Sequence, residues 1–328
     1  MASIASVAIH PSQFPEQVRR DMLDSLRSRK INHKFHYDSI KQTHQWLALH
    51  QAYSPSRTDP DCSAIYDAGF EFVANSLQGA RVHLIGLGCG GGQKDARLLK
   101  LLHESGNDVS YTPADVSAAM VLVARQAALE IIPERNCFPL VCDLATAEDL
   151  DETIARLPPF GSPRILTFFG MLPNFEQIFV FNRLAALLQR QDFLLLSANL
   201  APGDNYTAGM ERILPLYDNS LTRDWLSSFL FDIGIEKGDG ELLFLIENDP
   251  AESGLKRVTA HFRFLRNREI EVYSERFVFQ AGERLRLFFS YRHTPERVRS
   301  LLAQHGLRLQ AEWLTSSEEE GVFFAIRS

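Results

Sequence analysis

The sequence predicts an α/β protein: an open, doubly wound parallel sheet interrupted by an inserted α+β unit. Three observations lead to this fold class. Apolar segments of strand length alternate with amphipathic helices between residues 81 and 200. A glycine-rich loop follows the first of these strands, and after residue 200 long runs of alternating apolar and polar residues replace the earlier pattern. The first pattern is typical of βαβ units with right-handed crossovers, and the last is typical of antiparallel strands.

The expected elements follow in chain order. Strands of the parallel sheet are expected at 81–86, 108–115, 138–144, 164–170 and 192–200, with helices at 95–103, 118–129 and 175–188. In the insert we expect a helical stretch at 205–234 and strands at 256–265, 268–280 and 283–292, the last two joined as a hairpin across Ala281-Gly282. Thr294-Pro295 begins another helix, which Gly306 ends. A final hairpin is expected to extend the parallel sheet with an antiparallel edge strand.

Length and pattern together predict two domains. At 328 residues the chain is about twice the usual length of one domain. The first 60 residues are polar and turn-rich, with one helical piece at 14–29, and they precede the strand–helix alternation. We therefore expect a sheet domain formed by 61–200 plus 294–328, and a second domain formed by 1–60 plus 201–293.

Composition narrows the functional classes. Hydrophobic residues make up 45% of the chain and charged residues 23%, as in globular proteins with a sizeable core. The net charge of −7 disfavours a nucleic-acid binder, and no apolar run reaches the roughly 20 residues of a membrane span. The N-terminus lacks the features of a secretory signal, so a cytoplasmic protein is expected. The four cysteines have no metal-ligand spacing, so they are interpreted as reduced structural thiols and no metal site is predicted.

The glycine-rich loop, Gly86-Leu-Gly88-Cys-Gly90-Gly-Gly, lies between a strand and a helix. Open α/β sheets bind nucleoside cofactors at this position, because glycines allow a close backbone approach and the helix N-terminus offers free amides. Asp115 ends the next strand, where a carboxylate accepts hydrogen bonds from ribose hydroxyls; a helix cap is its alternative role. Asp143, with Leu144 beside it, is suited to the exocyclic amine of adenine; an ordinary aspartate in a loop is its alternative. The loop also matches the dinucleotide fingerprint, so a nicotinamide cofactor and S-adenosylmethionine (SAM) both remain open.

A set of motifs then resembles one family in order and spacing. The matching segments are Phe35-His-Tyr37-Asp38, Tyr53-Ser-Pro55-Ser-Arg57, Gly88-Cys-Gly90-Gly-Gly-Gln-Lys94, Asp115-Val-Ser117, Asp143-Leu144, Phe168-Phe-Gly170-Met-Leu-Pro-Asn174-Phe175, Tyr217-Asp218 and Phe289-Ser290-Tyr-Arg-His-Thr294-Pro295-Glu296. Together they resemble the histidine N-alpha-methyltransferases of the ergothioneine pathway and related SAM-dependent amino-acid methyltransferases. The resemblance runs through most of the chain.

The resemblance implies a Rossmann-like SAM methyltransferase sheet with an inserted substrate-binding domain, and an enzyme that methylates an amino group. The residues that it implies for SAM are Tyr37, Gly86, Gly88, Gly90, Lys94, Asp115, Asp143 and Leu144. Tyr53, Asn174 and Tyr217 are implied as catalytic and, together with Ser290, as substrate-binding residues. Transfer of a methyl group to an amine depends mainly on positioning, and either tyrosine is suited to accept a hydrogen bond from the amine.

The sequence departs from the family pattern where that family recognises the imidazole ring. The family's Glu corresponds to Phe288, two residues before Ser290, and its Met corresponds to Ala260. Strict alternation would place the side chains of 284, 286, 288, 290 and 292 on one face. Loss of the carboxylate removes an acceptor that discriminates imidazole, so we expect a larger apolar or aromatic amino acid or amine instead of histidine. A shifted alignment, in which Glu283 or Glu271 replaces the missing carboxylate, is the alternative.

Two other functional classes remain open from the sequence. One is an NAD(P)-dependent oxidoreductase, which rests on the literal glycine match. The other is a SAM-binding protein without catalysis, against which the retained Tyr53, Asn174 and Tyr217 argue. The expected partner is a small amino acid or amine, with neither nucleic acid nor membrane, and the oligomeric state is left open.

Overall fold

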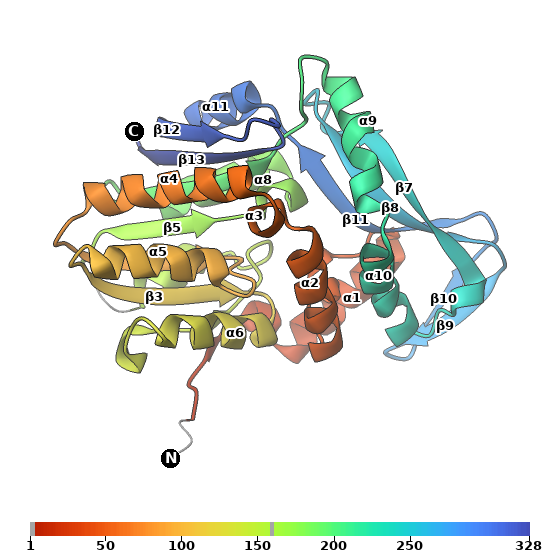
Figure 1. Ribbon diagram of the computed structural model, residues 1–328. Coiled ribbons are helices and arrows are strands. Elements are labelled where there is room, and N and C mark those ends of the chain that lie inside the picture. The colour runs from red at the N-terminus through yellow and green to blue at the C-terminus, as the bar shows by residue number, and fades with distance from the viewer. Residues whose placement is uncertain (1–3, 158–160) are drawn as a thin grey trace. The chain divides into compact units, whose positions relative to one another are not determined.

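The computed structural model describes residues 4–157 and 161–328, and the chain forms two compact units (Figure 1). The sheet unit comprises the residues described up to Gln13, Pro55–Leu200 and His293–Ser328; the insert unit comprises Phe14–Ser54 and Ala201–Arg292. The sequence-based boundaries assigned all of 1–60 to the second domain. The structure instead places the residues before Phe14 with the sheet, because they form a strand of it, and also 55–60, where the helices that cover it begin.

The sheet unit is built on one mixed sheet, with eight strands in the described residues and the order β1-β4-β3-β2-β5-β6-β13-β12. Its strands are β1 (Ala8–Ile9), β2 (Arg81–Leu87), β3 (Asp108–Asp115), β4 (Leu140–Val141), β5 (Arg164–Phe168), β6 (Phe193–Asn199), β12 (Leu307–Leu314) and β13 (Glu320–Arg327). Strands β1 to β6 pair in parallel, whereas β13 pairs antiparallel with β6 and β12 antiparallel with β13. The predicted α/β class and the antiparallel terminal hairpin are confirmed.

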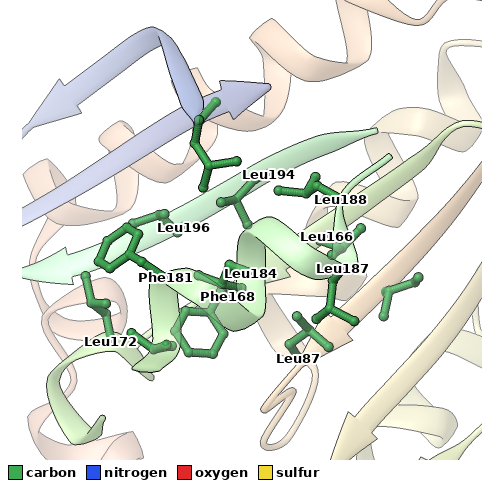
Figure 2. Packing of buried hydrophobic residues seen from close by; sticks show 14 of the residues in the cluster. Leu87, Leu166, Phe168, Leu172, Phe181, Leu184, Leu187, Leu188, Leu194 and Leu196 are labelled. Carbon is green, nitrogen blue, oxygen red and sulfur yellow. The ribbon is translucent and has the colours of Figure 1, made fainter. Parts of the chain in front are cut away.

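Helices cover both faces of this sheet. They are α3 (Pro55–Thr58), α4 (Pro60–Ser76), α5 (Gln93–Glu104), α6 (Ala118–Leu129), α7 (Leu150–Ala155), α8 (Gln177–Leu187) and α11 (Pro295–Gln304). Strand β2 is buried from Val82 to Leu87, and its alternate residues enter two cores: Ile85 packs with α7, α8 and α11, and Leu84 packs with α4, α5 and α6. Figure 2 shows the first core, where Phe181 and Leu184 of α8 lie against the strands.

The strand order reverses between β2 and β5. From β2 the chain proceeds to β3 and β4 on one side, and then returns to β5 on the other. In open α/β sheets this switch point leaves a crevice at the carboxyl ends of the strands. The loops that follow β2 and β5 therefore flank the position where such a fold binds its ligand.

The insert unit is an α+β structure. Its helices are α1 (Pro15–Ser28), α2 (Ile40–Tyr53), α9 (Tyr206–Tyr217) and α10 (Ser220–Asp232), and its strands are β7 (Gly240–Asn248), β8 (Lys256–Phe264), β9 (Arg268–Val272), β10 (Glu275–Phe279) and β11 (Arg284–Arg292). Strands β11, β8 and β7 form one antiparallel sheet, and β9 and β10 form a separate ribbon. The expected helical stretch 205–234 is divided at Asn219, whose side chain accepts the Thr222 N–H and caps α10.

One strand prediction in the insert is wrong. The segment 268–280 is not one strand but the β9–β10 hairpin, and β10 does not pair with β11 across Ala281-Gly282. The turn lies at Tyr273 and Ser274, which both have positive φ angles (50° and 65°). Hairpin turns of this kind usually contain glycine or asparagine, so the two residues gave no turn signal in the sequence.

Candidate functional site

The glycine-rich loop is a tight turn between β2 and α5, at the switch point of the sheet. Gly88 and Gly92 have φ angles of +66° and +73°, a region that residues with a Cβ rarely adopt. A Cβ at Gly88 would lie 2.5 Å from Sδ of Met171, and one at Gly92 would lie 2.7 Å from Cα of Ala124. Glycine is therefore required at both positions. Gly86 has a different role, since its missing side chain leaves room for the carboxylate of Asp95, 2.1 Å from where a Cβ would stand.

Asp115 at the end of β3 is bonded directly to this loop. Its Oδ2 accepts the Gly90 N–H at 2.9 Å, and its Oδ1 accepts the Ser117 N–H at 3.0 Å. Burial raises the pKa of Asp115, while these backbone N–H groups act in the opposite direction. Each carboxylate oxygen uses one lone pair on the backbone and retains others. The carboxylate is thus fixed in position at the end of β3 and can accept further hydrogen bonds.

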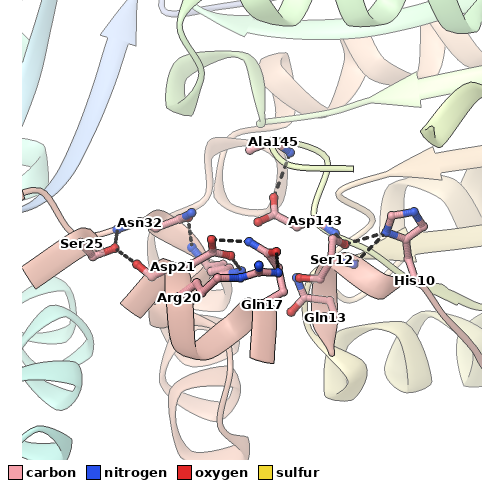
Figure 3. Close-up of polar contacts among 11 residues, drawn as sticks. His10, Ser12, Gln13, Gln17, Arg20, Asp21, Ser25, Asn32, Asp143 and Ala145 are labelled. Atoms are coloured by element: carbon pink, nitrogen blue, oxygen red, sulfur yellow. Dashed lines mark hydrogen bonds and ion pairs between the residues drawn. The ribbon is translucent and has the colours of Figure 1, made fainter. Parts of the chain in front are cut away.

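Asp143 and Leu144 follow β4, the neighbour of β3. The Asp143 Oδ1 accepts the Ala145 N–H at 2.9 Å, and the Asp143 N–H donates to Oγ of Ser12 at 3.0 Å (Figure 3). Leu144 is partly buried against the core that packs on α8. The adjacent ends of β3 and β4 thus carry two buried aspartates, and Ser12 was not among the residues that the sequence predicted.

Lys94, predicted to hold the cofactor, lies in a buried polar network. Its Nζ donates to the hydroxyl of Tyr66 at 2.9 Å and stands 4.2 Å from the centre of that ring. The Tyr66 hydroxyl in turn donates to Oε1 of Glu320 on β13 at 2.6 Å. Burial lowers the pKa of Lys94, and the nearby Glu320 carboxylate opposes that effect. Neither Tyr66 nor Glu320 had a sequence signal, because the residues are 254 positions apart and meet only through the packing of α4 on β13.

Asp95, the next residue on α5, joins three strands to the loop. Its Oδ2 accepts the hydroxyl of Tyr111 on β3, and its Oδ1 accepts the hydroxyl of Thr167 on β5, both at 2.7 Å. Burial raises the pKa of Asp95 to about 6. Because its carboxylate also lies under Gly86 of β2, this side chain fixes the start of α5 relative to β2, β3 and β5.

Asn174 lies on the other side of the switch point. It ends the short 3₁₀ turn Leu172–Asn174 after β5, and its N–H donates to the carbonyl of Met171 at 3.0 Å. The Met171 side chain lies against Gly88, so the loops after β2 and β5 are in contact. Asn174 itself is half-buried.

In the insert unit, four of the predicted substrate residues come together. Ala260 on β8 and Phe288 on β11 are direct cross-strand partners. The Tyr217 ring at the end of α9 lies 6.2 Å from the Phe288 ring, and the Tyr217 and Ser290 hydroxyls are hydrogen-bonded at 2.8 Å. The buried guanidinium of Arg292, which the sequence did not single out, also donates to the Tyr217 hydroxyl, from Nε at 3.2 Å and Nη2 at 3.1 Å.

Aromatic rings surround Phe288. Trp225 of α10 lies 5.9 Å and His33 lies 5.2 Å from its ring centre. The predicted cofactor residue Tyr37 continues this aromatic cluster within the insert unit, 5.5 Å from Trp225. Burial lowers the pKa of His33 well below its usual range, so this ring is neutral at pH 7. The remaining predicted residue, Tyr53, ends α2 with 51% of its surface exposed.

The expected single face of 284–292 is wrong because β11 contains a bulge. The register with β8 shifts between Arg286 and Phe288. Arg286 pairs with His261, on the opposite face from the Ala260–Phe288 pair, and Arg284 likewise leaves the Phe288 face. Phe288, Ser290 and Arg292 therefore face α9 and α10 without these two arginines.

The two alternative carboxylates lie outside the Ala260–Phe288 pair. Glu283 accepts the Gln280 N–H at 2.9 Å and pairs with Arg29 at 2.5 Å, in the turn before β11. Glu271 is exposed on β9, in the separate ribbon. Phe288 is the residue that lies opposite Ala260.

Two further observations concern metal binding and membrane-spanning helices. Within residues 4–157 and 161–328, no group of three or more His, Cys, Asp or Glu side chains is arranged to hold a metal ion. In the same part of the chain, no helix combines the length and the apolar character needed to cross a membrane.

A parallel sheet with a glycine loop at its switch point and carboxylates at the ends of the next two strands defines an enzyme that binds a nucleoside cofactor. The family model of the histidine-specific, SAM-dependent methyltransferases matches residues 18–209 and 251–326. The chain belongs to this family and is a SAM-dependent methyltransferase. The alternatives of a nicotinamide-dependent oxidoreductase and of a non-catalytic SAM-binding protein are therefore set aside.

Solved structures with a related fold were also found. The SAM complex of magnesium protoporphyrin IX methyltransferase from Synechocystis PCC 6803 is 15% identical, with a TM-score of 0.46 over 91% of this chain and 98% of that one. The CcbJ methyltransferase from Streptomyces caelestis is 14% identical, with a TM-score of 0.40 over 80% and 96%. The glycopeptide N-methyltransferase MtfA with SAM is 14% identical, with a TM-score of 0.37 over 79% and 93%. A search of the curated proteins gave no match.

Proposed function

We propose that this methyltransferase acts on the amino group of an amino acid or related amine whose side chain is large and apolar or aromatic, and not on histidine. The observation that carries the proposal is the direct pairing of Ala260 with Phe288 in the middle of the β8–β11 ladder. These positions correspond to the Met and Glu that the family uses for the imidazole ring. In this chain both are apolar, and rings of Tyr217 and Trp225 pack on Phe288.

The residues at the switch point fit SAM. The backbone turns tightly at Gly88 and Gly90, which both have positive φ angles, and Asp115, held by two backbone N–H groups, is assigned to the ribose hydroxyls. Asp143, at the end of the adjacent strand, is assigned to the adenine amine and Leu144 to the face of the base. Lys94 and Tyr37 are assigned to the remainder of the cofactor only through the family resemblance, since in the structure Lys94 bonds to Tyr66.

SAM supplies an electrophilic methyl group bound to a sulfonium sulfur. The substrate amine must be neutral, so that its nitrogen lone pair forms the new N–C bond while the C–S bond breaks and one proton leaves the nitrogen. The hydroxyl of Tyr217 is assigned to accept a hydrogen bond from that amine. Its own partners, Ser290 and Arg292, fix the position of this hydroxyl. Asn174 is assigned to the amino-acid amine or carboxylate, and Tyr53 to the amine.

Selectivity against histidine follows from the apolar character of the site formed by Phe288 and Ala260. An imidazole in an apolar site leaves its N–H without an acceptor, which costs about 1–3 kcal/mol, or roughly 5- to 150-fold in kcat/KM. An apolar ring placed there instead gains about 25 cal/mol for each Å² that it buries. Edge-to-face packing on Phe288 and Tyr217 adds about 0.5–1.5 kcal/mol.

The test is a methylation assay with SAM and the twenty amino acids, together with simple aromatic amines, with products identified by mass spectrometry. We expect methylated amine only with large apolar or aromatic substrates, and kcat/KM for histidine at least about tenfold lower. Histidine as the best substrate would overturn the proposed specificity. Methylation of oxygen or carbon, with no N-methylated product, would overturn the amine assignment.

A further inference from the structure

The N-terminal strand of the sheet unit holds the loop between β4 and α7 at two points. Strand β1 pairs in parallel with β4, and the His10 N–H donates to the carbonyl of Val141 at 2.9 Å. Just after β1, Ser12 Oγ accepts the Asp143 N–H at 3.0 Å, and His10 Nε2 lies 2.8 Å from Oδ1 of Asp149. The loop of residues 143–149, which carries the proposed adenine contacts, is thus fastened at its first and last residue.

The direction of these hydrogen bonds can be assigned. The backbone N–H of Ser12 donates to Nδ1 of His10 at 3.0 Å, so Nδ1 is an acceptor. The ring proton is then on Nε2, which donates to Asp149. The Ser12 hydroxyl lies 2.9 Å from the same Nδ1 and donates to it, which turns the oxygen lone pairs toward the Asp143 N–H (Figure 3). A continuous relay therefore runs from Asp149 through His10 and Ser12 to the backbone of Asp143.

Because the inner residues of this relay are buried, the loss of one of their hydrogen bonds is costly. His10, Ser12 and Asp143 are 7%, 5% and 5% exposed, whereas the Asp149 side chain at the outer end is 55% exposed. A buried backbone N–H that loses its acceptor costs about 1–3 kcal/mol, so without Ser12 the backbone at Asp143 must shift to find another partner. The carboxylate would move with it, since its Oδ1 is tied to the N–H of Ala145 two residues on.

We propose that Ser12, oriented by His10, is a positioning residue that sets the enzyme's selectivity for the adenine base. It acts through Asp143, whose carboxylate accepts a hydrogen bond from the 6-amino group. An inosine base carries an oxygen at this position and cannot donate. The inference rests on the SAM dependence of the family and on the proposed role of Asp143, but not on the identity of the methyl acceptor.

The experiment measures binding alone. Isothermal titration gives the Kd of S-adenosylhomocysteine and of S-inosylhomocysteine for the wild-type protein and for Ser12→Ala. The matched control is Ser110→Ala on β3, because Ser110 is also a buried serine bonded to a histidine, His83, at 2.8 Å. Ser110 lies five residues before Asp115, at the other end of β3. Ser12→Cys fills nearly the same space with a weaker acceptor and serves if the alanine variant does not fold.

We expect wild type and Ser110→Ala to prefer the adenosyl ligand to the same degree. In Ser12→Ala the ratio of the two Kd values should fall about fivefold, the equivalent of one hydrogen bond of about 1 kcal/mol, with little change for the inosyl ligand. Equal weakening of both ligands would overturn the proposal, since it would indicate a general loss of structure. A wild-type protein that binds both ligands equally would overturn it as well. Neither result depends on which amine is methylated.

Discussion

Ala260 and Phe288 face each other as direct partners across the β8–β11 ladder, 28 positions apart in the sequence. The bulge just before Phe288 separates it from Arg286, which would share its face in a regular strand. The sheet face that packs on α9 and α10 therefore carries Phe288 and Ser290, and Tyr217 of α9 contacts both. This arrangement underlies the first two predictions.

The first prediction is a change of specificity. The double substitution Ala260→Met with Phe288→Glu restores both residue types that the family uses for imidazole. We expect kcat/KM for histidine, relative to the best aromatic substrate, to rise at least about tenfold. Because Phe288 is only 9% exposed, the carboxylate should also lower the free energy of unfolding by about 2–4 kcal/mol.

Each single substitution serves as a control for this double variant. Steady-state kinetics with both substrates, and thermal melts of all four proteins, give the measurement. An unchanged substrate ratio in a folded double variant would mean that the Ala260–Phe288 pair does not contact the substrate.

The second prediction concerns the hydroxyl of Tyr217. Tyr217→Phe removes the group bonded to Ser290 and Arg292, so kcat/KM should fall about 100-fold. The affinity for S-adenosylhomocysteine should be unchanged. The matched control is Tyr206→Phe on the same helix, whose hydroxyl accepts the Lys256 N–H at 2.7 Å. The control should lose stability but retain activity per folded molecule, and an equal loss of activity in both variants would contradict a specific role for Tyr217.

The third prediction separates substrate binding from cofactor binding at Asn174. Asn174→Ala should reduce turnover to below about 1% of wild type, because an amine that is not aligned loses most of the advantage of positioning. The Kd of S-adenosylhomocysteine should change less than about twofold. Asn136→Ala is the control, since its side chain donates to the carbonyl of Val109 in the same unit. A matching loss of cofactor affinity in Asn174→Ala would place Asn174 at the cofactor instead.

The fourth prediction is a pH dependence of stability. In the folded protein the pKa of Asp95 is about 6, above its ordinary value of 3.8. Between these two values the folded state keeps a proton that the unfolded state has lost. The resulting stabilisation is complete below about pH 4 and is lost as the pH rises through 6, by up to about 3 kcal/mol.

Asp95→Asn, which cannot titrate, removes this contribution. The difference in unfolding free energy between wild type and Asp95→Asn should therefore fall between pH 4 and pH 6 and stay level from pH 7 to pH 8. Urea unfolding of both proteins across this range gives the measurement. A difference that rises with pH would show that hydrogen bonds from Tyr111 and Thr167 outweigh the burial of the carboxylate.

Much of the fold was predictable because local patterns and packing agree. The helix expected at 118–129 is observed as Ala118–Leu129, and the strand expected at 108–115 as Asp108–Asp115. The strand expected at 138–144 contains only Leu140–Val141, because the chain turns at Asp143 to form the loop that β1 fastens. The sequence of strand β7 shows no clear alternation of apolar and polar residues. This agrees with its burial, because most of its residues are half-buried.

The sequence by itself determined the open α/β sheet and the glycine loop with Asp115 and Asp143 at successive strand ends, and it suggested Phe288 and Ala260 as the positions that set specificity. These depend on residues close together in the chain, where periodicity, turn chemistry and motif spacing apply. Only the tertiary structure decided the bulge in β11, the Lys94–Tyr66–Glu320 network and the hydrogen bond from the Asp143 N–H to Ser12. Those features join side chains far apart in sequence, and their partners are selected by packing and by the need of buried polar groups for hydrogen bonds.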